Sequence, residues 1–446
     1  MEGTGWSLGT KPRFIREPGG EGAEGSLAVE NPRSPRSSYA HVLAAEALRL
    51  FPGGEMPPEG YALMTLPQGA VALAETPQAA HRARQAMKAL RRPGGRQALA
   101  TIVDWPDMTW RGLHVLDSGP ASLPALLRLV REFLAPHRLN VLVYEIDYSF
   151  RFTSHPEMMI DDVWTGEQVG ELVAACRAEG IRVIPQINCL GHQSWKQPPG
   201  ALLRRHPEFE EAPDPSNPYM DINSEKFYCR SWCPLHPDVN AFACDLIDEV
   251  LDAFDSDLFH AGMDEVFVIA SPSCPRCGGK DPGELFAKAV NDIHAHLKGR
   301  GRGMLMWGDR FIDGKATGMG LWEASENGTH RAIDLVPKDI IVCDWHYEPM
   351  PAYPSIEILS GKGFRVWPTA WRKLDAQRAL MKAARERNDR KVLGLLATIW
   401  YPAGRMAGAL IPGVAGPPEP GEKDAEGART VLAGLREAWN PEDNAE

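Results

Sequence analysis

The feature that most constrains the fold is a strand–helix rhythm that repeats from about residue 110 to residue 400. Short apolar runs alternate with amphipathic segments such as Leu123–Leu134 and Val239–Phe254. Continuous apolar runs of this length are typical of parallel strands that are buried on both faces. The eight strand candidates are Gly112–Asp117, Asn140–Asp147, Arg182–Asn188, Leu258–Glu265, Met304–Asp309, Ile340–Trp345, Phe364–Thr369 and Leu393–Trp400.

Eight alternating units predict an α/β fold of the (β/α)8 TIM-barrel type. The alternative is an open doubly wound sheet, but no Gly-rich phosphate turn follows the first strand. Upstream, Tyr39–Leu50 and Pro77–Leu90 have helical periodicity, and Tyr61–Leu66 and Ala70–Leu73 form a predicted hairpin. We therefore expect a flexible N-terminal segment over 1–36, a small α/β domain over 37–104 and the catalytic barrel over 105–446.

Composition narrows the classes of partner. The chain of 446 residues carries a formal net charge of −11, and no basic block is interleaved with aromatic residues, which argues against a nucleic acid. No run of 18 apolar residues occurs, so we expect no membrane partner. The Gly-rich, charged N-terminus has no apolar core of the kind a secretory signal needs. We therefore expect a cytoplasmic protein, of bacterial origin.

Two adjacent carboxylates, Asp264 and Glu265, stand where the fourth strand ends. Active sites of (β/α)8 barrels lie at the carboxyl ends of the strands. Cleaving a glycoside needs one protonated carboxyl and one that stays charged, and adjacent acids supply both if the backbone turns them toward one pocket. Acids, His and Trp at the other strand ends favour a polyhydroxylated neutral ligand.

Four segments carry a resemblance to a known family. They are Arg111–Asp117, Val183–His192, His260–Glu265 and Met306–Asp309. Through them the barrel resembles glycoside hydrolase family 20, the β-N-acetylhexosaminidases, and most of all the hexosaminidase D type and its bacterial relatives. The resemblance implies a hydrolase that removes β-linked N-acetylhexosamine from a glycan or glycoside. It also implies that catalysis needs no cofactor, and a homodimer is expected because relatives are often dimers.

The resemblance further implies substrate-assisted retaining hydrolysis. Glu265 would be the general acid and base, and Asp264 would orient the 2-acetamido group of the substrate. Tyr347 would donate a hydrogen bond to the acetamido oxygen, and Arg111 would grip ring hydroxyls. Trp307, Trp345 and Trp400 would wall the N-acetyl methyl group. The remaining predicted substrate-site residues are Glu145, His192, His260 and Asp309, with the two histidines orienting the acids.

Several alternatives stay open. Arg111 also fits an ion pair at the bottom of the barrel, His192 a buried core histidine, and Tyr347 a loop cap. A barrel that binds carbohydrate without turnover is one competing function. A metal-dependent TIM-barrel hydrolase with His192, His260 and acids as ligands is another. No acid follows Trp400 in the last strand, which leaves open the choice between GlcNAc and GalNAc and between exo- and endo-action.

One cysteine motif lies outside the family signature. Cys274-Pro275-Arg276-Cys277-Gly278 is typical of a knuckle that wraps a metal with two thiolates. A closed zinc site needs two further ligands, and Cys229 and Cys233 on the preceding loop would supply them. We therefore predict a structural zinc that braces loops, with four reduced thiols in a tight turn as the alternative.

Overall fold

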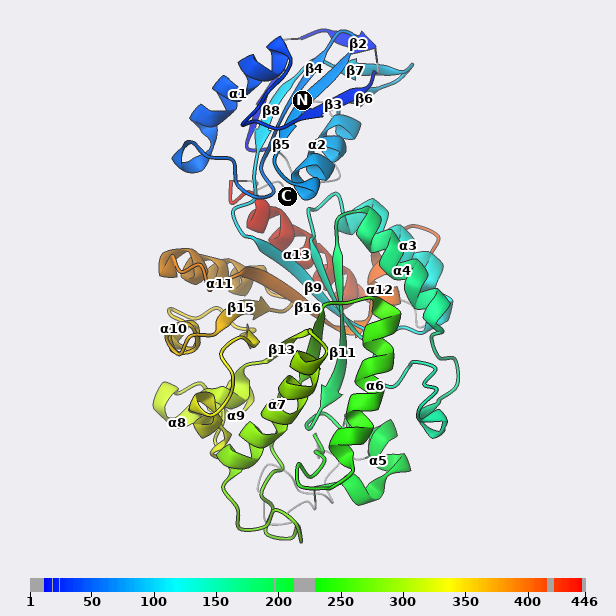
Figure 1. The fold of residues 1–446 in the computed structure, drawn as a ribbon, viewed down its shortest axis with the longest axis vertical. Helices are drawn as coiled ribbons and strands as arrows, with labels where there is room; N and C mark the ends of the chain where they lie inside the picture. Colours follow the sequence, from blue (N-terminus) through cyan, green and yellow to red (C-terminus); the bar gives the residue numbers. More distant parts are fainter. Residues whose placement is uncertain are drawn as a thin grey trace.

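A barrel and a small domain stacked on one end of it make up the protein (Figure 1). The computed structural model describes residues 12–442 apart from 18, 24, 196–197, 212–228 and 415–420. The first eleven residues of the predicted N-terminal segment lie outside the described residues.

Eight parallel strands close into the barrel in chain order, and the last pairs with the first. Gly394 lies opposite Trp110 and Ala397 opposite Leu113, which closes the sheet. All eight predicted runs form these strands, so the barrel is confirmed. The strands are β9 (Trp110–Leu116), β10 (Val141–Glu145), β11 (Arg182–Cys189), β12 (Leu258–Gly262), β13 (Gly303–Trp307), β14 (Ile341–Trp345), β15 (Arg365–Ala370) and β16 (Gly394–Pro402).

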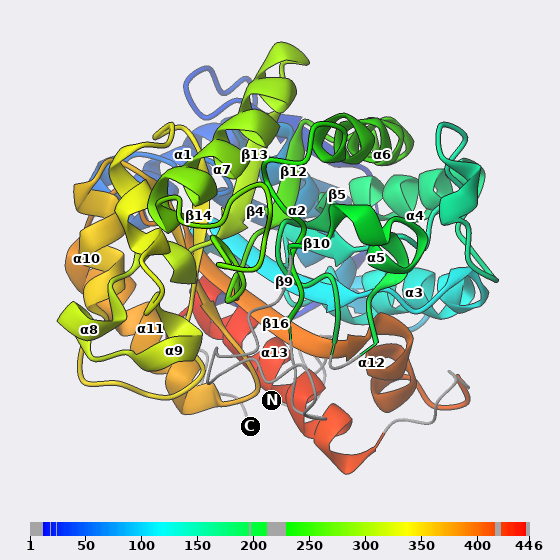
Figure 2. The same cartoon turned by 90° about the horizontal axis from the view of Figure 1, so that it is seen from below.

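Helices surround the strands, as the view along the barrel shows (Figure 2). Local sequence sets their ends: Thr165 and Gln168 form a capping box that begins the fourth helix. The helices are α3 (Leu123–Leu129), α4 (Gly166–Ala178), α5 (Ala201–Arg205), α6 (Val239–Phe254), α7 (Pro282–Gly299), α8 (Gly314–Thr317), α9 (Gly320–Glu323), α10 (Pro354–Gly361), α11 (Leu374–Arg387), α12 (Ala403–Leu410) and α13 (Glu422–Trp439).

The small domain is a mixed sheet between two helices. Because side chains alternate along a strand, Leu63 packs toward the second helix and Ala62 toward the first. The five-stranded sheet has the order β1 (Phe14–Arg16), β8 (Thr101–Asp104), β4 (Tyr61–Leu66), β5 (Gly69–Ala74) and β3 (Leu27–Glu30). The helices are α1 (Ser38–Leu50) and α2 (Pro77–Ala89), and β2 (Glu21–Ala23), β7 (Arg96–Ala98) and β6 (Arg91–Arg92) form a second sheet.

The predicted separation of residues 1–36 from the small domain is wrong for the part that is described. β1 pairs with β8, β3 pairs with β5, and β2 pairs with β7. The composition of this segment is Gly-rich and polar, but edge strands need only backbone hydrogen bonds and one contacting face. The predicted hairpin is confirmed as β4 and β5, whose residues Leu66 and Gly69 lie opposite each other.

A buried charge cluster joins the small domain to the bottom of the barrel. Arg111 Nη2 donates to both oxygens of Glu59 at 2.9 and 2.8 Å, and its guanidinium lies 4.9 Å from the ring of Trp439. Arg111 is fully buried at the amino end of β9, opposite the end that holds the acid pair. The prediction that Arg111 grips ring hydroxyls is therefore wrong, and the ion-pair alternative is confirmed.

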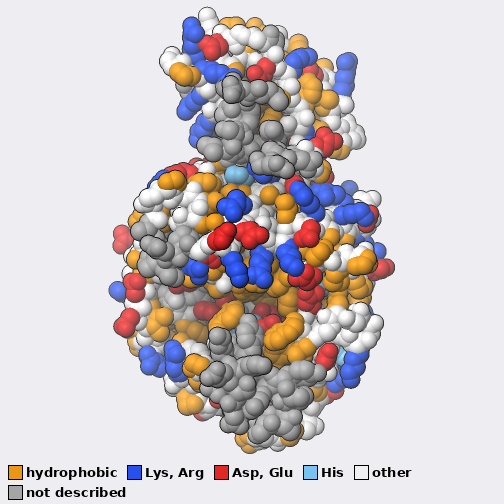
Figure 3. Space-filling view, turned by 180° about the vertical axis from the view of Figure 1, so that it is seen from behind, with side chains coloured by type: hydrophobic (Ala, Val, Ile, Leu, Met, Phe, Trp, Pro, Cys, Tyr) orange, Lys and Arg blue, Asp and Glu red, His pale blue; other side chains and the backbone are white. Residues whose placement is uncertain are grey.

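The surface carries both signs of charge. Lys and Arg side chains lie beside Asp and Glu side chains on the face seen from behind (Figure 3). Among the described residues, no helix has the length and apolar character that crossing a membrane requires.

Candidate active site

The acid pair lies beside a cavity of about 260 Å³ at the carboxyl ends of the strands, the end that Figure 2 shows from below. This volume is below the usual ~300–1,000 Å³ of ligand sites, so it suits a small ligand. The carboxyl-terminal parts of β14 and β16 and the loops after β11, β12, β14 and β15 supply the lining. The lining residues are His192, Trp195, Asp264, Glu265, Trp345, Tyr347, Trp371 and Trp400.

Left-handed backbone aims the two acids at one place. Met263 has φ 67° and Glu265 has φ 47°, so the residues directly before and after Asp264 both have left-handed backbone. Gly262 is also left-handed, and a Cβ there would lie 2.4 Å from the side-chain oxygen of Asn188. Strained non-glycine residues of this kind cluster at functional sites. The turn brings both carboxylates to the same histidine.

His192 bridges the two carboxylates. Its Nε2 lies 3.0 Å from Asp264 Oδ2 and 3.0 Å from Glu265 Oε2. Burial alone would lower the pKa of His192, but the Asp264 carboxylate and the Cys229 sulfur together outweigh it and raise the pKa well above the usual value. The imidazole is therefore a cation at neutral pH, and it stabilises the charge of Asp264.

The second oxygen of Asp264 has no partner. Asp264 and Glu265 are 5% and 8% exposed, and Asp264 Oδ1 accepts no hydrogen bond from any described residue. A buried acceptor without a donor costs free energy, so such an atom calls for a ligand donor or water. This oxygen belongs to a residue that lines the cavity.

Asp309 fixes the backbone of the general-acid candidate. Its Oδ2 accepts from the Glu265 amide at 2.9 Å and from Arg310 Nε at 2.6 Å. Trp345 Nε1 donates to its other oxygen at 3.3 Å. Burial raises the pKa of Asp309 to about 6, although Arg310 opposes the shift. Asp309 thus holds Glu265 and Trp345 in place from below the cavity.

An aromatic wall faces the acids. Tyr347 stacks on Trp345 with ring centroids 4.9 Å apart, and its hydroxyl accepts from Trp400 Nε1 at 2.8 Å. Burial raises the pKa of Tyr347 well above the usual value, so the hydroxyl keeps its proton and can donate it to a ligand. Flat apolar faces beside one hydroxyl suit an N-acetyl group.

A clamp below the wall holds the Tyr347 loop. His346 Nδ1 lies 2.6 Å from Glu323 Oε2, and its Nε2 lies 2.8 Å from Ser355 Oγ and 3.2 Å from Asp344 Oδ1. Burial alone would lower the pKa of His346, but the two acids, Asp344 foremost, raise it to about 9. The cation therefore ties the loop to two acids at neutral pH.

A family model described as the catalytic domain of glycosyl hydrolase family 20 matches residues 110–403. The chain belongs to glycosyl hydrolase family 20. The predicted family is thereby confirmed, while the placement near the hexosaminidase D type stays a prediction.

Curated proteins similar to this family 20 chain include the beta-hexosaminidase of Akkermansia muciniphila, 27% identical over 277 residues, which are 52% of this chain and 51% of the relative. The beta-hexosaminidase subunit beta of Homo sapiens is 27% identical over 240 residues, 48% of this chain and 40% of the relative. The chain thus spans about half the length, or less, of these relatives.

Solved structures of family 20 members share the fold. A beta-N-acetylhexosaminidase from Bacteroides fragilis aligns with TM-score 0.66 and 15% identity over 96% of this chain and 90% of that one. A GH20 exo beta-N-acetylglucosaminidase from Vibrio harveyi, in complex with N-acetylglucosamine, aligns with TM-score 0.65 and 15% identity over 100% and 76%.

Four predicted substrate-site residues lie beneath the family 20 cavity instead of on its lining. Glu145 is saturated by His114, Gln186 and Asn188 inside the barrel. His260 Nδ1 accepts from the Gly262 amide at 3.1 Å, and its ring packs on Trp307. All four are buried and none is among the residues that line the cavity, so they support its floor. The four are Glu145, His260, Trp307 and Asp309.

Sequence reasoning missed Trp195 and the position of Cys229 at the site, whereas Trp371 was among the tryptophans expected at strand ends. Trp195 lies 4.8 Å from the ring of His192, and Trp371 lies 5.4 Å from the ring of Tyr347. Trp371 directly follows β15, whereas Trp195 lies six residues beyond the end of β11. Cys229 Sγ lies 3.5 Å from His192 Nδ1 and 3.6 Å from Glu265 Oε2, a contact that no local motif indicates.

The position of Cys229 corrects the predicted ligand set. Cys233, Cys274 and Cys277 come together as expected, but their fourth neighbour is Glu211. Cys229 instead belongs to a separate buried group with His192 and Glu265.

A larger cavity, of about 470 Å³, lies at the other end of the barrel under the small domain. Its acidic residue Glu59 is fully engaged by arginines, and its Asp255 pairs with Arg177. Because its charges are already paired and it lies at the amino ends of the strands, it does not compete as the reaction site.

Proposed function

We propose that this family 20 chain is a glycoside hydrolase that removes terminal β-linked N-acetylhexosamine by substrate-assisted retaining hydrolysis. One observation carries the proposal: Asp264 keeps a buried oxygen beside the cavity that no described residue donates to, while its other oxygen and Glu265 share His192. The similar curated proteins bear the name beta-hexosaminidase, which agrees with this choice of substrate.

In the first step the acetamido oxygen of the substrate attacks C1. Glu265 donates its proton to the leaving oxygen, and the bond from C1 to that oxygen breaks. Asp264 Oδ1 accepts the acetamido N–H and stabilises the positive charge of the oxazolinium ion that forms. In the second step Glu265 takes a proton from water, which attacks C1 and reopens the ring with retained configuration.

The aromatic wall and His192 prepare the site for this chemistry. The Tyr347 hydroxyl donates to the acetamido oxygen, and the faces of Trp345 and Trp400 enclose the methyl group. His192 keeps both acids oriented, because its Nε2 lies 3.0 Å from an oxygen of each. The substrate supplies the nucleophile, so the protein needs one proton donor and one fixed anion.

The decisive experiment measures hydrolysis of aryl N-acetyl-β-glucosaminide and aryl N-acetyl-β-galactosaminide. We expect Asp264→Asn and Glu265→Gln each to lower kcat by about 10²–10⁴-fold. Glu265→Gln should lose less on substrates with an acidic phenol as leaving group, since such a phenol needs no proton. A thiazoline mimic of the oxazolinium ion should inhibit the wild type competitively. The control is Glu167→Gln, an exposed acid on α4.

Two results would overturn the proposal. Binding of N-acetylglucosamine by calorimetry without turnover of either glycoside would indicate a carbohydrate-binding barrel. Activity that a chelator abolishes and a divalent metal restores, without inhibition by the thiazoline, would indicate a metal-dependent hydrolase built on His192, Cys229 and Glu265.

A further inference from the structure

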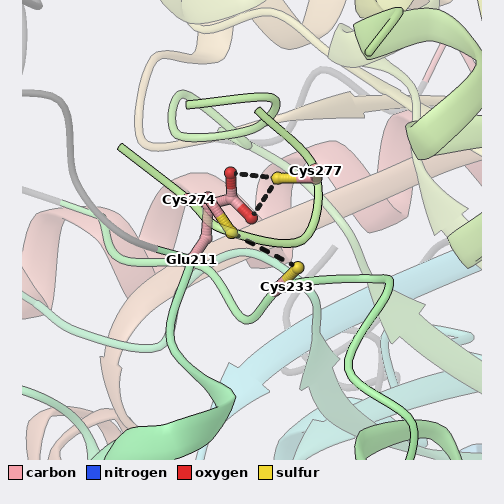
Figure 4. Close-up of side chains that lie close together, drawn as sticks. All are labelled: Glu211, Cys233, Cys274 and Cys277. Carbon is pink, nitrogen blue, oxygen red and sulfur yellow. Dashed lines mark hydrogen bonds between the residues drawn. The ribbon is translucent and has the colours of Figure 1, made fainter. Parts of the chain in front are cut away.

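We propose that Glu211, Cys233, Cys274 and Cys277, here called the Cys3Glu cluster, form a structural zinc site that braces the loops of the catalytic face. One ligand atom from each residue lies within 4.8 Å of the others. Figure 4 shows the three sulfurs and the carboxylate pointing toward one another from separate segments. The site stands independently of the proposed hydrolytic activity.

The distance between two of the sulfurs fits a tetrahedral ion. Two sulfurs that each lie about 2.3 Å from one zinc are about 3.8 Å apart at the tetrahedral angle. Cys233 Sγ and Cys274 Sγ are 3.7 Å apart. Cys277 Sγ lies 2.6 and 2.8 Å from the two oxygens of Glu211, the spacing of a thiol proton shared with a carboxylate. Zinc would replace that proton and hold the sulfur and one oxygen about 3.5 Å apart. Three thiolates with one carboxylate favour zinc over magnesium or calcium.

The backbone of the knuckle fixes the sulfur of Cys274. The backbone amides of Arg276 and Cys277 donate to that sulfur. Gly278 donates its amide to the Cys274 carbonyl at 3.0 Å, which closes the turn. The turn therefore holds Cys274 and Cys277 on one short loop, the arrangement in which a knuckle presents two sulfurs to one metal.

Burial makes the Cys3Glu cluster a site rather than a surface group. The four side chains are between 0% and 3% exposed. A buried carboxylate beside three thiols needs a proton or a cation to stay there. The guanidinium of Arg276 lies beside Cys233. Its positive charge would offset part of the net negative charge of a zinc ion with four anionic ligands.

The position of the cluster defines its role. Glu211 lies on the loop after β11, Cys233 precedes α6, and the knuckle lies between β12 and α7. The Ser271 amide also donates to Glu211 Oε1 at 2.9 Å, and the Glu211 amide donates to the Ser231 carbonyl at 2.9 Å. The same loop carries Cys229, which touches Glu265. None of the four ligands lines the described cavity, so the ion would fix loops and take no part in hydrolysis.

The test begins with the metal content of the purified full chain. We expect one zinc per chain by elemental analysis after exhaustive dialysis. Cys274→Ser and Cys277→Ser should lose it, whereas Cys244→Ser, a partly exposed cysteine on α6, should keep it. In the wild type, a mercurial reagent should release the zinc to a chromogenic chelator as the thiols react. This measurement requires no folded variant.

A second readout concerns the ligands. Growth with cobalt in place of zinc should give the visible bands of tetrahedral Co²⁺ and a sulfur-to-cobalt charge-transfer band. Glu211→Gln should shift those bands while keeping the charge transfer, because the sulfurs remain. Strong chelation should lower the melting temperature, and added zinc should restore it.

Three results would overturn the proposal. They are absence of stoichiometric zinc with all eight thiols titratable, a disulfide between Cys233 and Cys274 found by mass spectrometry, and full zinc retention in Cys274→Ser and Cys277→Ser.

Discussion

The two ends of the barrel hold buried charges that are satisfied to different extents. At the bottom, both oxygens of Glu59 accept from Arg111, and Arg82 and Asn140 add further donors. At the top, Asp264 has one oxygen on His192 and one without a partner in the described part of the chain. A saturated network binds two parts of a fold together, whereas an unsaturated one leaves an atom for a substrate.

The pKa values show the same contrast. Burial alone would raise the pKa of Glu59, but Arg111 and Arg82 outweigh it and lower the pKa to about 2. At the top, burial raises the pKa of Asp309 to about 6, and its one direct cation, Arg310, does not reverse the shift. Glu59 at the bottom is therefore ionised throughout the neutral range, whereas Asp309 at the top has a pKa close to neutral pH.

The largest expected effect is a loss of rate without a loss of stability. Asp264→Asn should lower kcat by about 10²–10⁴-fold, because the amide cannot stabilise the oxazolinium charge. The free energy of unfolding should stay level or rise, since a buried like charge is removed. Steady-state kinetics and urea titration of the same preparation check both. A parallel fall in stability and rate would erase the contrast between the two ends.

The opposite effect, a loss of stability without a loss of rate, is expected at the bottom of the barrel. Glu59→Gln leaves Arg111 and Arg82 without a counter-charge, which should lower the free energy of unfolding by about 3–5 kcal/mol. The kcat of the protein that remains folded should not change. Glu21→Gln breaks an exposed pair with Arg96 and serves as the control, with an expected cost of about 0–1 kcal/mol. If Glu59→Gln instead lowers kcat at unchanged stability, the two ends are coupled.

A fall in pH should lower the stability of the protein through protonation of Glu59 at the bottom of the barrel. The folded pKa of Glu59, about 2, lies below its unfolded value, so its stabilisation is full above about pH 4.5. It is lost as the pH falls toward 2. The stability difference between the wild type and Glu59→Gln should therefore shrink over this window, measured by urea titration at stepped pH. A difference that is constant from pH 6 to pH 3 would contradict the ion pair.

A rise in pH should lower activity through loss of the proton of His192 at the top of the barrel. The raised pKa of His192 means that its stabilising charge is full below the unfolded value of about 6.5 and is lost as the pH rises through the folded value. His192→Gln should lower kcat by about 10–100-fold, because a hydrogen bond to a charged group contributes about 1.5–3 kcal/mol. The variant should also lose the alkaline limb of the wild-type pH–kcat profile. An identical limb in both would assign it to another group.

The smallest effect is expected at Cys229. Cys229→Ser keeps a small donor beside Glu265 and His192, so kcat should change by less than about tenfold, as one neutral hydrogen bond contributes about 0.5–1.5 kcal/mol. Cys343→Ser, a buried cysteine of β14, controls for the cost of adding a hydroxyl. A loss as large as that of His192→Gln would place the thiol among the groups that position the acid.

Local patterns predicted much of the barrel. Apolar runs bounded by polar strand ends located all eight strands, because a strand buried on both faces must be apolar along its length. The same ends located the acid pair, His192, Tyr347 and three of the lining tryptophans. The position of Arg111 could also be predicted from the sequence, since a residue at the start of a strand lies at the bottom of a parallel barrel.

The sequence by itself determined which residues are available: the strands, the adjacent acids and the cysteine knuckle. Only the tertiary structure decided their partners. Glu211 joins the knuckle from 63 positions away from Cys274, and Cys229 meets His192 from another loop. Left-handed backbone at Met263 and Glu265 sets the course of the chain around Asp264, and none of the described residues donates to its Oδ1. Partnership between distant side chains depends on how loops pack, and no local periodicity encodes it.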